Sequence, residues 1–242
     1  MNRDELILNK GSKSVVAEAY RVLRTNIMYA SIDKKIKTIA VTSSGPAEGK
    51  SSTVANFAIA LAHAGSRVLI IDSDLRKPRI HKIFGISNRV GLTNIVVEDL
   101  DWKENLHALE ELPELSIIPS GPIPPNPSEL CGSAKMKNFI NSIKEEFDYV
   151  IIDTPPSGVV TDGTLVASYV DGTILVVASG NVEIEAVKRT KNLLNNVNAN
   201  ILGVVLNKIP VNDSGYYKYY YYSYYHDDEK GKKKRKKRTK AI

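Results

Sequence analysis

Short runs of aliphatic and β-branched residues recur along the chain, and longer stretches between them carry apolar residues at three- and four-residue spacing. The short runs predict strands, and the longer stretches, such as residues 52–65 and 182–197, predict helices. Because the strands are apolar along their whole length and alternate with helices, we expect an α/β fold with a mostly parallel sheet flanked by helices. The predicted strands are residues 37–43, 67–72, 115–120, 149–154, 172–179 and 200–207.

Two further segments have a distinct pattern. Residues 14–29, which include EAYRVLR, predict a helix before the first strand. Residues 121–127, GPIPPNP, predict a loop, because their prolines lack backbone donors and fix φ.

The end of the chain has a composition that does not suit a core. Residues 216–225 read YYKYYYYSYY and contain eight of the twelve tyrosines, and residues 231–240 read GKKKRKKRTK. A buried tyrosine needs a partner for its hydroxyl, and this run shows no alternation that would hide one face. We therefore predict an N-terminal helical segment (1–34), a core (35–210) and a disordered, tyrosine-rich and basic tail (211–242).

The net charge of +6 comes from this tail. From His226 onward there are nine Lys and Arg against three Asp and Glu, so 24 basic and 24 acidic residues precede it. A neutral body argues against nucleic-acid binding. The single cysteine, Cys131, excludes an intrachain disulfide. No apolar run approaches the roughly 18 residues of a membrane span, and the N-terminus does not resemble a secretion signal, so we expect a cytoplasmic protein.

A phosphate-binding loop is indicated by SGPAEGKS at residues 44–51, between a predicted strand and a predicted helix. Backbone amides of such a loop surround phosphate oxygens; Lys50 would reach the β and γ phosphates, and the Ser51 hydroxyl would bind Mg²⁺. Ser44 stands where the strict pattern has glycine, but Gly45 and Gly49 remain. We therefore expect ATP and Mg²⁺ as ligands. The predicted nucleotide-binding residues are Gly45, Pro46, Ala47, Glu48, Gly49, Lys50, Ser51, Ser52 and, at the adenine edge, Asn207.

Acidic residues stand at the ends of two predicted strands. Asp153 ends YVIID, and LIIDSDLRKP places Asp72, Asp74 and Arg76 two residues apart, on one face if the chain stays extended. We assign the metal to Ser51, Asp72 and Asp153, the proton-accepting role to Asp72 with Asp74 as second choice, and charge stabilisation to Arg76 and Lys50. The alternative is that these acidic residues only stabilise turns.

Glu18, Arg21 and Arg24 recur at three-residue spacing on the predicted first helix. This face would suit contact with another subunit, but an ordinary solvated helix face looks the same.

Taken in order along the chain, EAYRVLR, SGPAEGKS, LIIDSDLR, GPIPPNPSEL, YVIIDTPP and the tyrosine cluster resemble the bacterial tyrosine kinases of capsule and exopolysaccharide assembly. The resemblance implies a P-loop NTPase fold of the partition-ATPase type, with Asp72, Asp74 and Asp153 as metal and base cluster. It implies further that Glu18, Arg21 and Arg24 build a ring. The implied phosphoacceptors, modified by a neighbouring subunit, are Tyr216, Tyr217, Tyr219, Tyr220, Tyr221, Tyr222, Tyr224 and Tyr225.

Family resemblance also implies partners. These are a transmembrane adaptor that activates the kinase and recruits it to the inner face of the membrane, protein-tyrosine substrates and a cognate phosphatase. Regulation of polysaccharide synthesis and export would be the output. The basic tail itself would add about 1 kcal/mol per residue if it touched anionic lipid, or it would only aid solubility.

The alternative function is that of a partition or cell-division ATPase, which dimerises on binding ATP. Those enzymes carry an additional lysine near the start of the P-loop, where this chain has Gly45. They do not usually end in tyrosine tracts.

Overall fold

The computed structural model describes residues 6–7, 14–31 and 35–209, and these contain one seven-stranded sheet with the order β3-β4-β2-β5-β1-β6-β7. All neighbouring strands are parallel except β3 and β4, which confirms the predicted mostly parallel sheet. The strands are β1 (Thr38–Ser43), β2 (Val68–Asp72), β3 (His107–Leu109), β4 (Leu112–Ile118), β5 (Tyr149–Asp153), β6 (Gly172–Ala178) and β7 (Ile201–Asn207).

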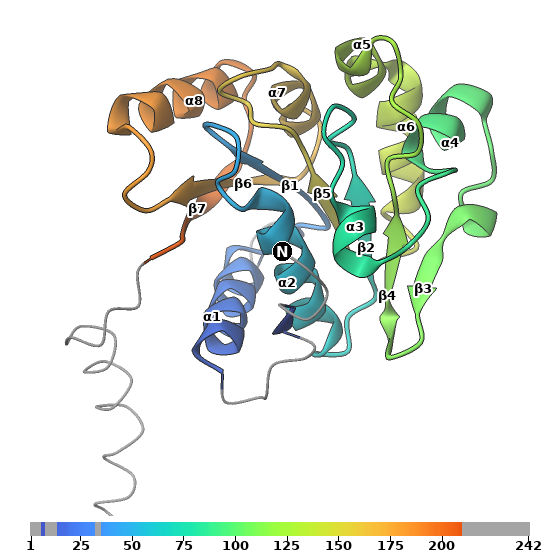
Figure 1. The fold of residues 1–242 in the computed structure, drawn as a ribbon, viewed down its shortest axis with the longest axis horizontal. Helices are drawn as coiled ribbons and strands as arrows, with labels where there is room; N and C mark the ends of the chain where they lie inside the picture. Colours follow the sequence, from blue (N-terminus) through green and yellow to red (C-terminus); the bar gives the residue numbers. More distant parts are fainter. Residues whose placement is uncertain (1–5, 8–13, 32–34, 210–242) are drawn as a thin grey trace, which may run out of the picture. The chain divides into compact units, whose positions relative to one another are not determined.

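Helices cover both faces of this sheet (Figure 1). Alternate strand residues enter two separate apolar layers: Ile39 and Ile70 pack with α1, α2 and α3, whereas Ala40 and Leu69 pack with α4 and α6. The helices are α1 (Val15–Ala30), α2 (Lys50–Ala62), α3 (Ile80–Phe84), α4 (Leu92–Glu98), α5 (Pro127–Gly132), α6 (Ala134–Ile143), α7 (Asp162–Ala167) and α8 (Ile184–Asn196).

Helix α2 is buried along almost its whole length, from Thr53 to Ala62. It lies between the sheet and α1, so neither of its faces needs polar residues, and its sequence is correspondingly apolar all round. This buried helix starts at the P-loop, which therefore rests on a rigid element.

Each predicted strand is present, with boundaries shifted by at most three residues. The short strand β3 was not predicted, because a three-residue antiparallel edge strand leaves almost no periodic signal. The predicted loop 121–127 ends one residue early, since Pro127 is the first residue of α5, a position that tolerates proline. The predicted tail, residues 211–242, lies outside the described residues.

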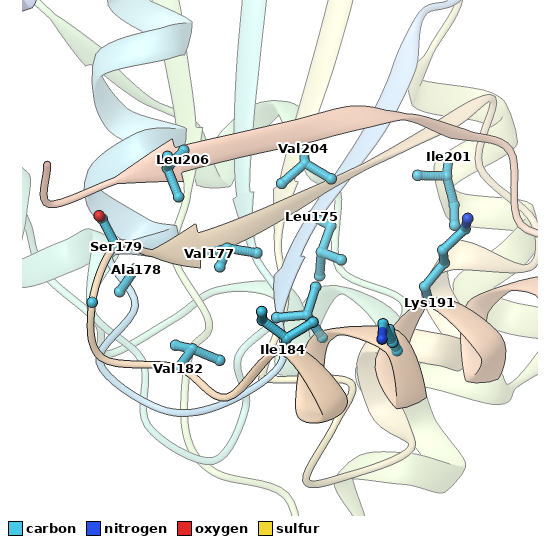
Figure 2. Close-up of a pocket in the computed structure, with 13 residues that line it drawn as sticks. Leu175, Val177, Ala178, Ser179, Val182, Ile184, Lys191, Ile201, Val204 and Leu206 are labelled. Atoms are coloured by element: carbon cyan, nitrogen blue, oxygen red, sulfur yellow. The ribbon is translucent and has the colours of Figure 1, made fainter.

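The sheet edge formed by β7 borders an apolar hollow of about 460 Å³ under α8. Figure 2 shows side chains from β6, β7 and the start of α8 turned toward this space, among them Val177, Ile184 and Val204. Its lining residues include no carboxylate, so the hollow lacks the acidic ligands expected at a metal site. Across the described ranges, no helix combines the length and apolar character that crossing a membrane requires.

Candidate active site

The P-loop connects β1 to α2, and its conformation depends on one buried carboxylate. Glu48 is 2% exposed; its Oε1 accepts hydrogen bonds from the Ser44 hydroxyl (2.7 Å) and the Gly45 amide, and its Oε2 accepts from the Ala178 amide (3.1 Å). Glu48 therefore holds both ends of the loop's turn and joins the loop to the end of β6. The Glu48 side chain thus stabilises the loop conformation. The prediction that Glu48 binds nucleotide therefore concerns its backbone.

Gly49 is the residue at which the loop turns into α2. Its φ of 92° lies in the left-handed region, which favours glycine, and a Cβ there would lie 2.1 Å from Nδ2 of Asn207. That Nδ2 donates a hydrogen bond to the Glu48 carbonyl at 3.0 Å, and the Lys208 ammonium donates to the Ala47 carbonyl at 2.7 Å. The end of β7 thus contacts the P-loop directly, a contact that the sequence did not predict.

Two of the predicted acids meet at the carboxyl ends of adjacent strands. Asp72 of β2 and Asp153 of β5 are register partners, and both are fully buried. Burial and the neighbouring Asp153 carboxylate raise the pKa of Asp72 well above its usual value. Burial raises the pKa of Asp153 to about 7, although Lys50 and Ser51 act to lower it.

The Asp72 carboxylate is occupied by backbone amides. Its Oδ1 accepts from the Asp74 amide (3.2 Å), and its Oδ2 accepts from the amides of Arg79 (3.1 Å) and Ile80 (3.0 Å). Asp74 is 7% exposed and lines the pocket in front of the P-loop. Of the two candidate bases, Asp74 is therefore the one with access to a bound molecule.

Asp153 offers the best fit to a metal ion. Both of its carboxylate oxygens are buried without a hydrogen-bond partner among the described residues, and Ser51 lies next to them. Buried polar atoms without partners are rare in proteins, and a cation would satisfy these. No group of three His, Cys, Asp or Glu in the described ranges is arranged to hold a metal by itself. A P-loop magnesium site does not need one, because phosphates and water supply further ligands.

Arg76 does not lie where the extended-chain prediction placed it, because the backbone bends after β2. Its Nε and Nη2 donate to the two oxygens of Asp162 at 2.7 and 3.1 Å, and Nη2 also donates to the Ser128 hydroxyl at 3.0 Å. The Ser128 hydroxyl also donates to Oδ1 of Asp162. Burial would raise the pKa of Asp162, but the hydrogen bonds from Arg76 and Ser128 hold it below its usual value. Asp162, the first residue of α7, was not among the residues predicted from sequence patterns. A catalytic role for Arg76 stays a prediction.

A pocket of about 540 Å³ opens in front of the P-loop. It brings together most of the predicted nucleotide-binding residues, whereas Gly45, Glu48 and Asn207 are not among its lining residues. It is also lined by cations that were not among the predicted site residues, Lys77, Arg79 and Lys82 among them. The lining residues are Pro46, Ala47, Gly49, Lys50, Ser51, Ser52, Asp74, Lys77, Arg79, Lys82, Ile83, Pro156 and Lys208.

The predicted subunit-contact residues lie on α1, far along the chain from the acids. Glu18 and Arg21 form an ion pair at 2.5 Å, and Nη1 of Arg24 donates to the Ala60 carbonyl of α2 at 3.1 Å. Arg24 thus fastens α1 to the core within one subunit. Ring assembly through this face stays a prediction, and the predicted phosphoacceptor tyrosines, residues 216–225, lie outside the described residues.

Comparisons with known proteins agree on one family. The family model described as "ParA: NUBPL iron-transfer P-loop NTPase" matches residues 34–227. The chain is 40% identical to tyrosine-protein kinase YwqD of Bacillus subtilis, over 86% of this chain and 87% of that protein.

Two solved structures are similar as well. The crystal structure of the chimerical protein CapA2B2 has a TM-score of 0.80 and 40% identity, covering 85% of this chain and 90% of that one. The kinase domain of the Escherichia coli tyrosine kinase ETK has a TM-score of 0.81 and 27% identity, covering 87% of this chain and 82% of that one. The chain therefore belongs to the bacterial tyrosine-protein kinases, a family with the ParA-type P-loop NTPase fold.

Proposed function

We propose that the protein is an ATP- and Mg²⁺-dependent, non-specific protein-tyrosine kinase that phosphorylates the tyrosine cluster 216–225 of a neighbouring copy. The observation that carries this proposal is the convergence of Lys50, Asp74 and the unpartnered Asp153 carboxylate at one end of the sheet, around the P-loop. Phosphoryl transfer needs this set of groups: a lysine for the phosphates, a carboxylate for the metal and a carboxylate for the proton.

The roles follow from position. Lys50 and the P-loop amides hold the β and γ phosphates, while Ser51 and Asp153 hold Mg²⁺. Bound Mg²⁺ would neutralise charge that develops on the transferred group. The tyrosine oxygen forms a bond to the γ phosphorus, the bond from that phosphorus to the bridging oxygen of ADP breaks, and the phenolic proton moves to a carboxylate.

Asp74 is the better-placed acceptor of that proton. It lines the pocket, whereas the oxygens of Asp72 accept three backbone hydrogen bonds and are fully buried. Asp72 then has a scaffolding role: its hydrogen bonds with backbone amides fix the turn that carries Asp74. This assignment reverses the order of preference that the sequence suggested.

Transfer between copies would link activity to assembly. Each phosphate adds about −1.5 to −2 charges, so a few modifications outweigh the positive charge of the tail. We propose that unmodified tails reach the active sites of neighbouring subunits in a ring built through Glu18, Arg21 and Arg24, and that accumulated phosphate loosens the ring. A transmembrane adaptor, a phosphatase and control of polysaccharide export complete this proposal, which rests on the family.

Intact mass spectrometry before and after addition of ATP and Mg²⁺ tests the activity. The native protein should gain several increments of about 80 Da, which peptide mapping assigns to residues 216–225. Lys50→Met should gain none, because the phosphate contact is lost, whereas Lys188→Met on α8 should behave like the native protein. A native protein whose mass stays unchanged, but which dimerises with ATP, would overturn the proposal in favour of an ATPase switch.

A further inference from the structure

Three cations on one wall of the active-site pocket have no partner within the described residues. Lys77, Arg79 and Lys82 line the pocket, their side chains are exposed, and no ion pair or side-chain hydrogen bond to the described parts of the chain involves them. We call these three residues the cationic rim. Three cations on a single wall, without carboxylate partners in the described part of the chain, concentrate positive potential there.

The backbone of the cationic rim is held in place by hydrogen bonds to Asp74, the proposed base, and to Asp72. The Lys77 amide donates to Oδ1 of Asp74 at 3.0 Å, and the Arg79 amide donates to Oδ2 of Asp72 at 3.1 Å. Helix α3, which follows Arg79 and carries Lys82, is anchored because its Ile80 and Phe84 are buried in the core. The rim backbone is therefore fixed relative to the carboxylates, which suits it to recognise a group at a set distance from the reacting tyrosine.

The phosphates of a nucleotide already have their own positive partners. Lys50, the P-loop amides and the N-terminus of α2 surround that position, and the rim belongs to a different segment, between β2 and α3. Asp74, the residue proposed to accept the tyrosine proton, is the one carboxylate among the described lining residues and lies at the start of that segment. A molecule that presents its hydroxyl to Asp74 would thus have its flanking residues close to the rim.

We propose that the cationic rim binds the acidic flank of the acceptor peptide, so that this kinase selects tyrosines with Asp, Glu or phosphate nearby. This inference rests on the proposed function for its catalytic consequence, but not for the binding itself.

The proposed role of the rim predicts the order in which the chain's own tyrosines are phosphorylated. Asp227, Asp228 and Glu229 follow Tyr225 after one intervening residue, so Tyr224 and Tyr225 have three acidic neighbours, whereas Tyr216 and Tyr217 have only Asp213 before them and Lys218 after them. Phosphate should appear first on Tyr224 or Tyr225. Each phosphate then supplies about −1.5 to −2 charges beside the next tyrosine, and modification should spread toward Tyr216.

Binding of acidic peptides to the rim can be measured in the absence of phosphoryl transfer. Fluorescein-labelled peptides with phenylalanine in place of tyrosine, flanked by Glu, Gln or Lys, are titrated by anisotropy with the full-length protein, Mg²⁺ and a non-hydrolysable ATP analogue. The Glu peptide should bind about tenfold more tightly than the Gln peptide at low salt, and less so at high salt. K77Q/R79Q/K82Q should lose this difference, whereas the matched control K188Q/R189Q/K191Q, with the same charge change on α8, should keep it.

A charge-reversal variant distinguishes loss of peptide recognition from misfolding. K77E/R79E/K82E should prefer the Lys peptide, a gain that misfolding does not produce. Equal binding of Glu and Lys peptides by the native protein would overturn the inference, as would an equal loss in the α8 control. So would a rim variant that loses affinity for a fluorescent ADP while it keeps its peptide preference, because the rim would then serve the nucleotide.

Steady-state kinetics of peptide phosphorylation test this inference and the proposed function separately. With the tyrosine forms of the same peptides, the rim variant should raise the KM for the Glu peptide and leave kcat nearly unchanged. A native protein that phosphorylates neither the peptides nor its own tyrosine cluster, yet shows rim-dependent binding, would contradict the proposed function and support the rim as an acidic-peptide site. Time-resolved mapping that finds phosphate first on Tyr216 or Tyr217 would contradict the inference alone.

Discussion

The side-chain amide of Asn207, the last residue of β7, donates a 3.0 Å hydrogen bond to the backbone carbonyl of Glu48 in the P-loop. Glu48 in turn binds the Ala178 amide at the end of β6 through its carboxylate. Two strands at one edge of the sheet therefore set the conformation of the loop that would hold the nucleotide phosphates. The Asn207 contact requires glycine at position 49, because a Cβ there would lie 2.1 Å from the Asn207 amide nitrogen.

Replacing Asn207 with alanine should weaken nucleotide binding. The Glu48 carbonyl would lose its donor at a cost of about 1 kcal/mol, which corresponds to roughly a fivefold loss of affinity if the loop conformation bears the whole cost. Titration with a fluorescent ADP measures this. Asn200→Ala is a matched control, because Asn200 also donates from its amide to a carbonyl, that of Asp171, at the opposite end of β7. An equal loss of ADP affinity in both variants would contradict a specific link to the P-loop.

Glu48→Gln should be more damaging than its small change in shape suggests. The buried carboxylate accepts hydrogen bonds from the Gly45 and Ala178 amides, and a glutamine would have to place its NH₂ group against one of these donors. Leaving one buried amide without an acceptor costs about 1–3 kcal/mol of unfolding free energy. Urea denaturation measures that cost, and ADP affinity should fall in parallel. A fully stable variant with weakened ADP binding would mean that the Glu48 charge acts on the nucleotide instead.

The sequence predicted the parallel sheet, the P-loop and the two strand-end acids, because each has a local pattern: β-branched runs, a glycine-rich turn and a carboxylate after a strand. It failed where an interaction depends on segments that are distant in the sequence. Asp162 meets Arg76 across 86 positions, and Asn207 meets Glu48 across 159. The bend after Asp72 also escaped prediction, since its stabilising hydrogen bonds come from amides seven and eight residues later.

Asp162→Asn should affect catalysis more than nucleotide binding. Asp162 is fully buried and holds the Arg76 guanidinium through two hydrogen bonds, whereas Arg76 itself is 40% exposed in its side chain. Without the carboxylate, the guanidinium is free to turn toward solvent, at a cost of about 1–2 kcal/mol to stability. We expect a lower kcat for peptide phosphorylation with little change in ADP affinity, measured by steady-state kinetics and titration.

The exposed pair between Arg67 and Asp148 provides the comparison for this variant. Asp148→Asn should cost at most about 1 kcal/mol and leave kcat unchanged, because surface ion pairs contribute little. If Asp162→Asn behaved like Asp148→Asn in both measurements, Arg76 would not depend on its partner.

Asp171 makes stability depend on pH. Burial would raise its pKa, but the amides of Thr38 and Lys37 and the Thr38 hydroxyl donate to its Oδ2 at 2.9, 3.0 and 2.9 Å and hold the pKa below its usual value. A carboxyl whose pKa is lower in the folded state stabilises the fold above its unfolded pKa of about 3.9, and this contribution is lost as the pH falls through the folded value.

Urea denaturation of Asp171→Asn at several pH values tests this contribution. The variant should be less stable than the native protein by about 1–2 kcal/mol at pH 7, because the ionised acceptor is lost. The difference should shrink as the pH falls below about 4, because the unfolded carboxyl takes up a proton there, and it should vanish at the lower pH where the native carboxyl also becomes neutral. A difference that stays constant down to pH 3 would mean that packing at this position, not charge, is responsible.

Asp153→Asn should stabilise the protein without ligands and abolish its response to Mg²⁺. In the described structure the Asp153 carboxylate is buried beside Asp72, its register partner, and its oxygens have no hydrogen-bond donor. A neutral amide removes the repulsion and the desolvation cost of that charge, so the thermal midpoint without nucleotide should rise by a few degrees, about 1–2 kcal/mol. Mg²⁺ and ADP together should raise the native midpoint well beyond ADP alone, and this extra increase should vanish in the variant, because the metal ligand is gone. A lower midpoint without ligand, together with a normal response to Mg²⁺, would show that Asp153 supports the fold and that the metal is held elsewhere.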